Sequence, residues 1–206
     1  MTLDFKDCAV IISLRSPFAR RVRLALREAG IPHEERVVDV LKPAAELIEK
    51  NPLARVPVVA LKSGCDLLDS NTILQLFYEA HPSPLFPKPL ESRMQVMGWG
   101  VLAAGVCEKI VEYYFDTMRP ARDAELDAET RAIIDRVLAR VESAIGSRET
   151  MVGDSLTQAD LDLGTMLRYI SLRHSDTWRA KFPSSARYLE ALEKRPSFRA
   201  TVPPPA

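Results

Sequence analysis

A serine followed by a proline opens an arginine-rich stretch near the start of the chain. Ser16 and Pro17 follow Arg15, and the next ten residues add Arg20, Arg21, Arg23 and Arg27. A serine before a proline is well suited to cap a helix with its side-chain oxygen. The free N–H groups at a helix start also favour anions. The stretch therefore predicts either a helix start built to hold an anion or a basic patch for nucleic acid.

A second serine precedes another helical pattern. In Asp69-Ser70 the serine comes before apolar residues at helical spacing, such as Ile73 and Phe77. The N–H groups of such a helix start suit a carboxylate. The alternative is a helix cap with a solvated acid.

Apolar periodicity places both serines at the ends of regular elements. The expected order is β-α-β-α-β-β-α. We expect strands at 8–13, 35–40, 56–61 and 66–69, and helices at 17–29, 44–50 and 70–81. Residues 8–12 of the first strand are all apolar, which indicates a strand buried on both faces.

A proline-rich segment divides the chain. Four prolines between 82 and 89 exclude a helix or an inner strand, so residues 82–90 are expected to form a stiff linker. The expected domains are therefore 1–81 and 91–206. The second domain is expected to be helical, with helices at 91–115, 128–145 and 184–193, and a capping box of Thr157 and Asp160 opens another helix.

Composition limits the classes of function. Of 206 residues, 28 are basic and 28 acidic, so no overall field attracts nucleic acid, and no aromatic platform accompanies the arginines. Uninterrupted apolar runs fall short of the roughly 20 residues of a membrane span. The three scattered cysteines have no metal-site spacing. We expect a cytoplasmic protein with no metal, no nucleic acid and no membrane partner.

Five motifs in register resemble the cytosolic glutathione transferases, and in particular their bacterial, serine-type and zeta-like members. The first-helix motif is Ser16-Pro-Phe-Ala-Arg-Arg-Val-Arg23 and the second is Asn51-Pro-Leu-Ala-Arg-Val-Pro-Val58. The others are Asp69-Ser70, Thr157-Gln-Ala-Asp160 and Arg195-Pro-Ser-Phe-Arg-Ala-Thr201. The resemblance implies an α/β thioredoxin-like domain followed by an all-helical domain.

The resemblance implies that Ser16 is the catalytic residue. Its hydroxyl is expected to stabilise the thiolate of glutathione, the co-substrate, for conjugation to an electrophilic small molecule. Because serine stands where cysteine-type members carry cysteine, disulfide reduction and dehydroascorbate chemistry are disfavoured. A pure capping role is the alternative, and we expect one hydroxyl not to serve both roles fully. Substitution of Ser16 by alanine separates them.

The resemblance also implies the other contacts of glutathione. The γ-glutamyl group is assigned to Asp69 and Ser70, and the peptide backbone to Val56, which a cis bond to Pro57 turns toward the ligand. A trans proline that begins an edge strand is the alternative. Lys42 and Arg55 are assigned to the glycyl carboxylate, although both are residue types that usually lie at the surface.

The electrophile is expected to be walled by Tyr113, Tyr114 and Met118, between the two domains. The family also implies a homodimer and a role in detoxification. Two alternatives stay open. The chain can be another glutathione-dependent enzyme on this scaffold, such as an isomerase or dehalogenase, or a non-catalytic binding or regulatory relative.

Overall fold

The structure is a computed structural model that describes residues 3–205, and it divides into two compact units. The first unit contains the described residues up to Phe86 together with Ser197–Pro204. The second contains Pro87–Pro196 and Pro205.

The first unit is built on a four-stranded mixed sheet in the order β2-β1-β3-β4. Its strands are β1 (Cys8–Ile12), β2 (His33–Val37), β3 (Val58–Ala60) and β4 (Asp66–Leu68). β1 pairs with β2 in parallel, whereas β3 is antiparallel to both β1 and β4. All five residues of β1 are buried, as the continuous apolar run predicts.

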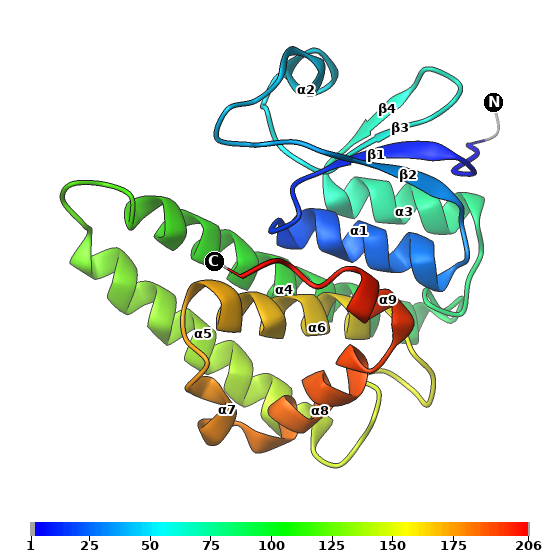
Figure 1. Cartoon of the computed structure of the whole chain (residues 1–206). Helices are drawn as coiled ribbons and strands as arrows, with labels where there is room; N and C mark the ends of the chain where they lie inside the picture. Colours follow the sequence, from blue (N-terminus) through cyan, green and yellow to red (C-terminus); the bar gives the residue numbers. More distant parts are fainter. Residues whose placement is uncertain (1–2, 206) are drawn as a thin grey trace. The chain divides into compact units, whose positions relative to one another are not determined.

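Helices cover both faces of this sheet. They are α1 (Pro17–Glu28), α2 (Ala45–Lys50) and α3 (Ser70–Ala80). α1 and α3 lie on one face, and α2 lies on the other (Figure 1). On the α2 side, Leu47 packs with Ile11 and Val58 in a fully buried cluster. The expected order β-α-β-α-β-β-α is confirmed, and the unit has the thioredoxin-like class of fold.

β2 starts two residues earlier than expected and ends three residues earlier. The expectation followed the valines between 37 and 40, but the strand is His33–Val37. Its parallel pairing with β1 aligns His33 with Cys8 and Val37 with Ile12. β2 is an edge strand with alternating exposure, so its polar residues are compatible with a strand that the apolar pattern did not reveal.

The segment Ser197–Pro204 belongs with the first unit rather than with the helical unit. Helix α9 (Pro196–Ala200) lies beside α1 (Figure 1). The Ser197 hydroxyl donates to the Glu28 carboxylate, and Arg20 contacts Thr201 and the Phe198 carbonyl. These contacts explain why the division differs from the expected one at residues 91–206.

The second unit is entirely helical within its described residues. Its helices are α4 (Leu90–Asp116), α5 (Ala124–Ile145), α6 (Gln158–Arg173), α7 (Trp178–Lys181) and α8 (Pro183–Glu193). α4 packs on α5 and α6, and α8 packs on the same two helices. α6 is buried along most of its length, which makes it the core of the unit.

The expected capping box opens α6. The Asp160 side chain is fully buried and accepts four hydrogen bonds. Its Oδ2 accepts from the Thr157 amide at 2.7 Å and hydroxyl at 3.0 Å. Its Oδ1 accepts from the Met151 amide at 2.7 Å and from the Tyr188 hydroxyl at 2.5 Å. Burial, together with Asp160, raises the pKa of Tyr188 well above its usual value.

α4 is the one helix in residues 3–205 that is long and apolar enough to cross a membrane. The sequence expectation considered only uninterrupted apolar runs. α4 meets a criterion based on helix length and mean hydropathy, which tolerates a few charged residues. A core helix of a water-soluble fold meets the same criterion, and α4 packs on two other helices of its unit.

Candidate functional site

Three of the predicted segments meet at one edge of the sheet. Since β1 and β4 are both antiparallel to β3, they run parallel to each other and end at the same edge. Ile11 near the end of β1 and Leu68 at the end of β4 both pair with Val58, the first residue of β3. α1 follows β1, α3 follows β4, and Val56-Pro57 precedes β3. The sheet therefore brings both helix starts and the Val-Pro segment together.

Ser16 caps α1, as predicted. Its Oγ accepts a hydrogen bond from the Ala19 amide at 3.2 Å, and Pro17 occupies the first helical position. A serine hydroxyl has one proton to donate and two lone pairs that accept. Capping uses a lone pair, so the proton stays available to an anion. The two roles of Ser16 therefore use different parts of the hydroxyl and do not compete, contrary to the expectation.

Asp69 caps α3 and Ser70 is its first residue. The Asp69 Oδ1 accepts from the Asn71 amide at 2.9 Å and the Thr72 amide at 3.1 Å. Asp69 adopts a φ of +65°, a left-handed value that is uncommon for a residue with a side chain. Ser70 is buried, with its Oγ accepting from the Arg21 Nη1 at 3.3 Å. The donors left to a ligand here are the amide and hydroxyl of Ser70 rather than the whole first turn.

The segment before β3 has the predicted cis peptide bond between Val56 and Pro57. Arg55 is exposed, and its carbonyl accepts from the Asn51 side chain at 2.8 Å. Lys42 is also exposed, in the loop that leaves β2 at the same edge of the sheet. Neither basic side chain is held by an ion pair in the described part of the chain, so their assignment to a carboxylate stays a prediction.

Two of the arginines of α1 pair with an acid on β2. Arg23 donates to Glu35 at 2.9 and 2.7 Å, and Arg27 donates to the same carboxylate at 3.0 Å. Burial raises the pKa of Glu35, but the hydrogen bonds and charges of both arginines outweigh it and hold that pKa at about 2. These two guanidinium groups are thus neutralised by an acid of the same unit, so they do not contribute to the basic patch that the sequence analysis considered.

Arg21 is a residue whose role the sequence did not single out. Arg20, Arg21 and Arg23 are all buried, although arginine is seldom buried without partners. Arg21 reaches from α1 to the first two residues of α3, where it donates to the Ser70 hydroxyl and the Asn71 side chain. Spacing within α1 indicates which arginines face inward, but it does not reveal a partner that lies 49 residues away.

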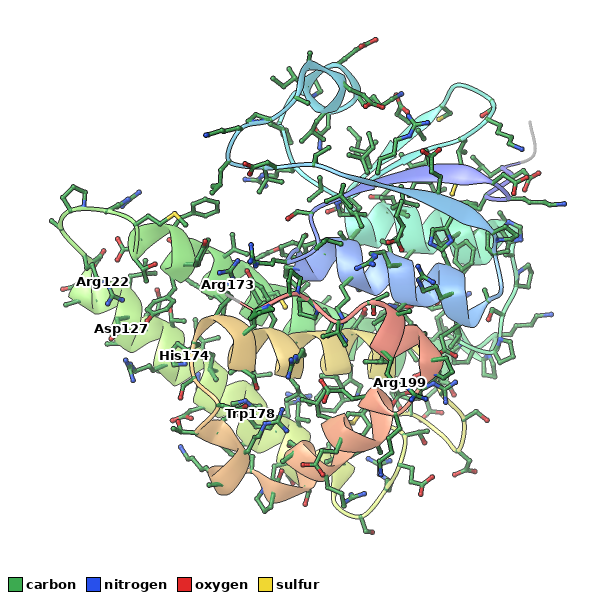
Figure 2. The ribbon with its side chains drawn as sticks, viewed as in Figure 1. Arg122, Asp127, Arg173, His174, Trp178 and Arg199 are labelled. Atoms are coloured by element: carbon green, nitrogen blue, oxygen red, sulfur yellow. The ribbon has the colours of Figure 1, made fainter. Side chains whose placement is uncertain are left out.

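The predicted electrophile residues lie in the second unit, at the end of α4. Tyr113 and Tyr114 are half-buried, and Met118 is exposed just beyond the helix. A guanidinium lies over each ring, with Arg122 at 5.3 Å from the Tyr113 centroid and Arg173 at 3.8 Å from the Tyr114 centroid. Arg122 lies just before the first residue of α5, and Arg173 is the last residue of α6 (Figure 2).

The Tyr113 ring also contacts His174, next to Arg173 (Figure 2). Burial lowers the pKa of His174, and the charge of Arg131 lowers it further. The imidazole is therefore neutral near pH 7. Arg173 forms no ion pair with a carboxylate of residues 3–205, and its Nε has no hydrogen-bond partner there. The pair of arginines beside two aromatic rings suits a planar anion.

The cysteines offer no reactive thiol at the edge of the sheet. Cys8 and Cys107 are buried, and Cys65 is exposed. Burial raises the pKa of Cys8 to about 11, which leaves almost no thiolate at neutral pH. Within residues 3–205, no three His, Cys, Asp or Glu side chains gather in a way that could hold a metal ion.

Comparisons with known proteins match both units. Residues 11–85 match the family model of the glutathione S-transferase N-terminal domain, and residues 121–191 match that of the C-terminal domain. A solved glutathione S-transferase from Methylobacterium radiotolerans, in complex with glutathione sulfonate, is 35% identical with a TM-score of 0.92. That match covers 96% of this chain and 95% of the other.

Two further relatives differ in what their names state. A glutathione transferase family member from Pseudomonas fluorescens, solved with bound S-(propanoic acid)-glutathione, is 26% identical with a TM-score of 0.83. The match covers 96% of this chain and 100% of that one. A Caenorhabditis elegans relative named for maleylacetoacetate isomerase is 27% identical over 92% of this chain and 90% of its own length.

Proposed function

Because the chain belongs to the glutathione S-transferase family, we propose that it adds reduced glutathione to electrophilic small molecules. One observation carries the proposal. Two helix starts and the cis Val56-Pro57 segment meet at one edge of the sheet, and each helix start holds a serine that keeps a proton to donate. Solved relatives bind glutathione or its derivatives.

The central role falls to Ser16. An unperturbed thiol with a pKa of about 8.5 is only ~3% ionised at pH 7, and lowering that pKa by ~2 units needs about 2.7 kcal/mol. A hydrogen bond from a hydroxyl to the anion supplies roughly 1.5–3 kcal/mol. The start of α1 adds ~0.3–2 kcal/mol, against the cost of desolvating the anion. All residues in the first turn of α1 are described by the structure, and none of them is an acid that would repel a thiolate.

The remaining groups of glutathione are assigned along the same edge. Ser70 takes the γ-glutamyl carboxylate with its amide and hydroxyl, and Asp69 meets the ammonium beside it. The main chain of Val56 pairs with the cysteinyl backbone. The exposed Lys42 and Arg55 attract the glycyl carboxylate.

Conjugation is favoured over disulfide exchange by the residue at position 16. Thiol–disulfide exchange needs a second thiolate, and a serine cannot form the mixed disulfide. Isomerisation is the second candidate, which the isomerase name of one relative supports. It also uses a glutathione thiolate, so both reactions require the same stabilised anion.

The electrophile carries an anionic group in this proposal. Arg122 and Arg173 lie over Tyr113 and Tyr114, and Met118 adds an exposed apolar side chain nearby. The ligand of the Pseudomonas fluorescens relative carries a carboxylate on the carbon chain attached to sulfur. Alkenes or halides with a carboxylate are therefore the first substrates to test.

The working protein is a homodimer in this proposal. Leu90, Met94, Met97 and Val101 follow an i, i+4, i+7, i+11 pattern on α4 and are 54–71% exposed. Such an apolar stripe on one helix face is expected to be covered in solution. A second copy of the chain presents the same stripe and can cover it.

Calorimetry with reduced glutathione tests the proposal, followed by turnover assays. Saturable binding and product formation with chlorodinitrobenzene or with a halogenated carboxylic acid support conjugation. Binding without turnover of either compound points to an isomerase or a non-catalytic relative. Absence of binding removes the proposal.

A further inference from the structure

The buried guanidinium of Arg21 contacts the two residues that begin α3. Arg21 is 6% exposed, and its Nη1 donates to the Ser70 Oγ and to the Asn71 Oδ1. This contact joins the helix that Ser16 caps to the helix that begins with Ser70.

The contact limits the directions that the Ser70 hydroxyl proton can take. A guanidinium only donates hydrogen bonds, so the Ser70 oxygen must accept from Arg21. Its own proton then points elsewhere, and no acceptor for it is found in residues 3–205. Ser70 is 3% exposed, so this is a buried donor, which ordinarily has a partner.

The helix start has few other donors to offer. The Asp69 carboxylate already accepts from the amides of Asn71 and Thr72. The amide and hydroxyl of Ser70 are therefore the donors left for an anion. A hydroxyl that turned its proton toward its own helix, or toward solvent, would lose half of this pair.

The other buried arginines of α1 are used differently. Arg23 pairs with the Glu35 carboxylate, and Arg20 contacts Thr201 and Phe198 of the C-terminal segment. Arg21, in contrast, donates to the residue that begins α3.

We propose that Arg21 is a positioning residue for the γ-glutamyl carboxylate of glutathione. It occupies the acceptor side of Ser70, aims the hydroxyl proton at the ligand, and holds the Asn71 side chain with its oxygen turned inward. This inference rests on the proposed glutathione function. Arg21 itself does not contact the ligand.

A pair of ligands separates this role from a purely structural one. γ-Aminobutyryl-cysteinylglycine has the amine, thiol and glycyl carboxylate of glutathione but lacks the γ-glutamyl carboxylate. Calorimetry measures both ligands with the wild-type chain, Arg21→Met, Arg21→Lys and Ser70→Ala. Arg27→Met is the matched control, because it removes an exposed arginine of the same helix that does not contact Ser70.

The wild-type chain is expected to prefer glutathione over the analogue by about tenfold or more, the range of a charge-assisted hydrogen bond. Arg21→Met is expected to reduce this preference to about threefold or less, as Ser70→Ala does, and combining the two changes adds little. Arg21→Lys keeps a charged donor but loses the planar guanidinium with its several N–H groups. Its preference for glutathione is expected to lie between those of the wild type and Arg21→Met. Arg27→Met keeps the full preference.

An unchanged preference in Arg21→Met, with both ligands weakened equally or the melting temperature alone reduced, overturns the inference and leaves a structural bridge between α1 and α3. If Arg21→Met does not fold, the same comparison in Arg21→Lys decides. A wild-type chain that does not bind glutathione overturns both this inference and the proposed function, whereas glutathione binding with an Arg21-independent preference overturns this inference alone.

Discussion

Ser16 and Ser70 lie at two helix starts, and their hydroxyl groups make the same kind of hydrogen bond. Each oxygen accepts a hydrogen bond from the protein, Ser16 from the Ala19 amide and Ser70 from Arg21. Each hydroxyl therefore keeps its proton for an anion. In the proposed function, one proton meets the thiolate and the other meets the carboxylate of the same tripeptide.

Replacing Ser16 with alanine is expected to lower kcat by about tenfold or more, since one charge-assisted hydrogen bond to the thiolate is lost. The KM for glutathione is expected to change less than threefold. Loss of the cap costs about 1 kcal/mol of stability. Steady-state kinetics and urea unfolding measure the two effects. Ser13→Ala serves as the control. Unchanged turnover in Ser16→Ala would show that Ser16 only caps α1 and does not stabilise the thiolate.

Glu35 makes stability depend on pH at the acid end. Its folded pKa of about 2 lies below the usual value of 4.5, so its contribution is fully present above pH 4.5 and is lost as the pH falls toward 2. The shift corresponds to on the order of 3 kcal/mol, and solvent screening lowers the expected loss in Glu35→Gln to about 2 kcal/mol at pH 7. Urea unfolding of both proteins from pH 7 to 3 should show the difference shrinking, and a constant difference would contradict this account.

At the scale of elements, the start of α6 depends on one buried carboxylate. Asp160→Asn keeps the shape but puts a donor where two donors already point, so we expect a loss of about 3 kcal/mol. Asp123, which caps α5 at the surface, offers a matched comparison. Its change to alanine is expected to cost about 1 kcal/mol. Equal losses in thermal unfolding would show that burial of Asp160 does not matter.

Local patterns predicted the longer helices and the serine at the start of α1 and of α3, because their signals lie within a few residues of each site. Ser16-Pro17 marks the start of α1, and Gly30, with a φ of +66°, lies just past its end. The start of β2 escaped prediction because an edge strand tolerates polar residues such as Glu34. The contact of Arg21 with Ser70 joins residues far apart in sequence, so no local pattern carried it.

The sequence predicted the composition of the candidate site better than its geometry. Val56, Pro57 and the two serines were named from motifs, and the sheet register then explains why their segments meet. The sequence did not show that the Asp69 carboxylate accepts hydrogen bonds from two amides of its own helix. Nor did spacing reveal the guanidinium groups over Tyr113 and Tyr114, because Arg122 and Arg173 lie on other segments.

At the scale of the whole molecule, the apolar stripe of α4 predicts self-association. Met97→Glu combined with Val101→Glu places two charges on the stripe, and we expect the dimer to dissociate. Ala139→Glu, an exposed site on α5, should leave it intact. Sedimentation at micromolar concentration measures the mass. A wild-type particle of 23.0 kDa, the mass of one chain, would contradict the dimer.

The state of the bound thiol tests the central claim most directly. Ultraviolet absorbance of the thiolate can be followed while the glutathione complex is titrated with base, in the wild-type chain and in Ser16→Ala. In the wild type, the account predicts that the bound thiol is half-ionised at a pH about 2 units below that of free glutathione. In Ser16→Ala, this pH is expected to rise by about 1 unit or more toward the value of free glutathione. A bound thiol that titrates like free glutathione in both proteins would contradict it.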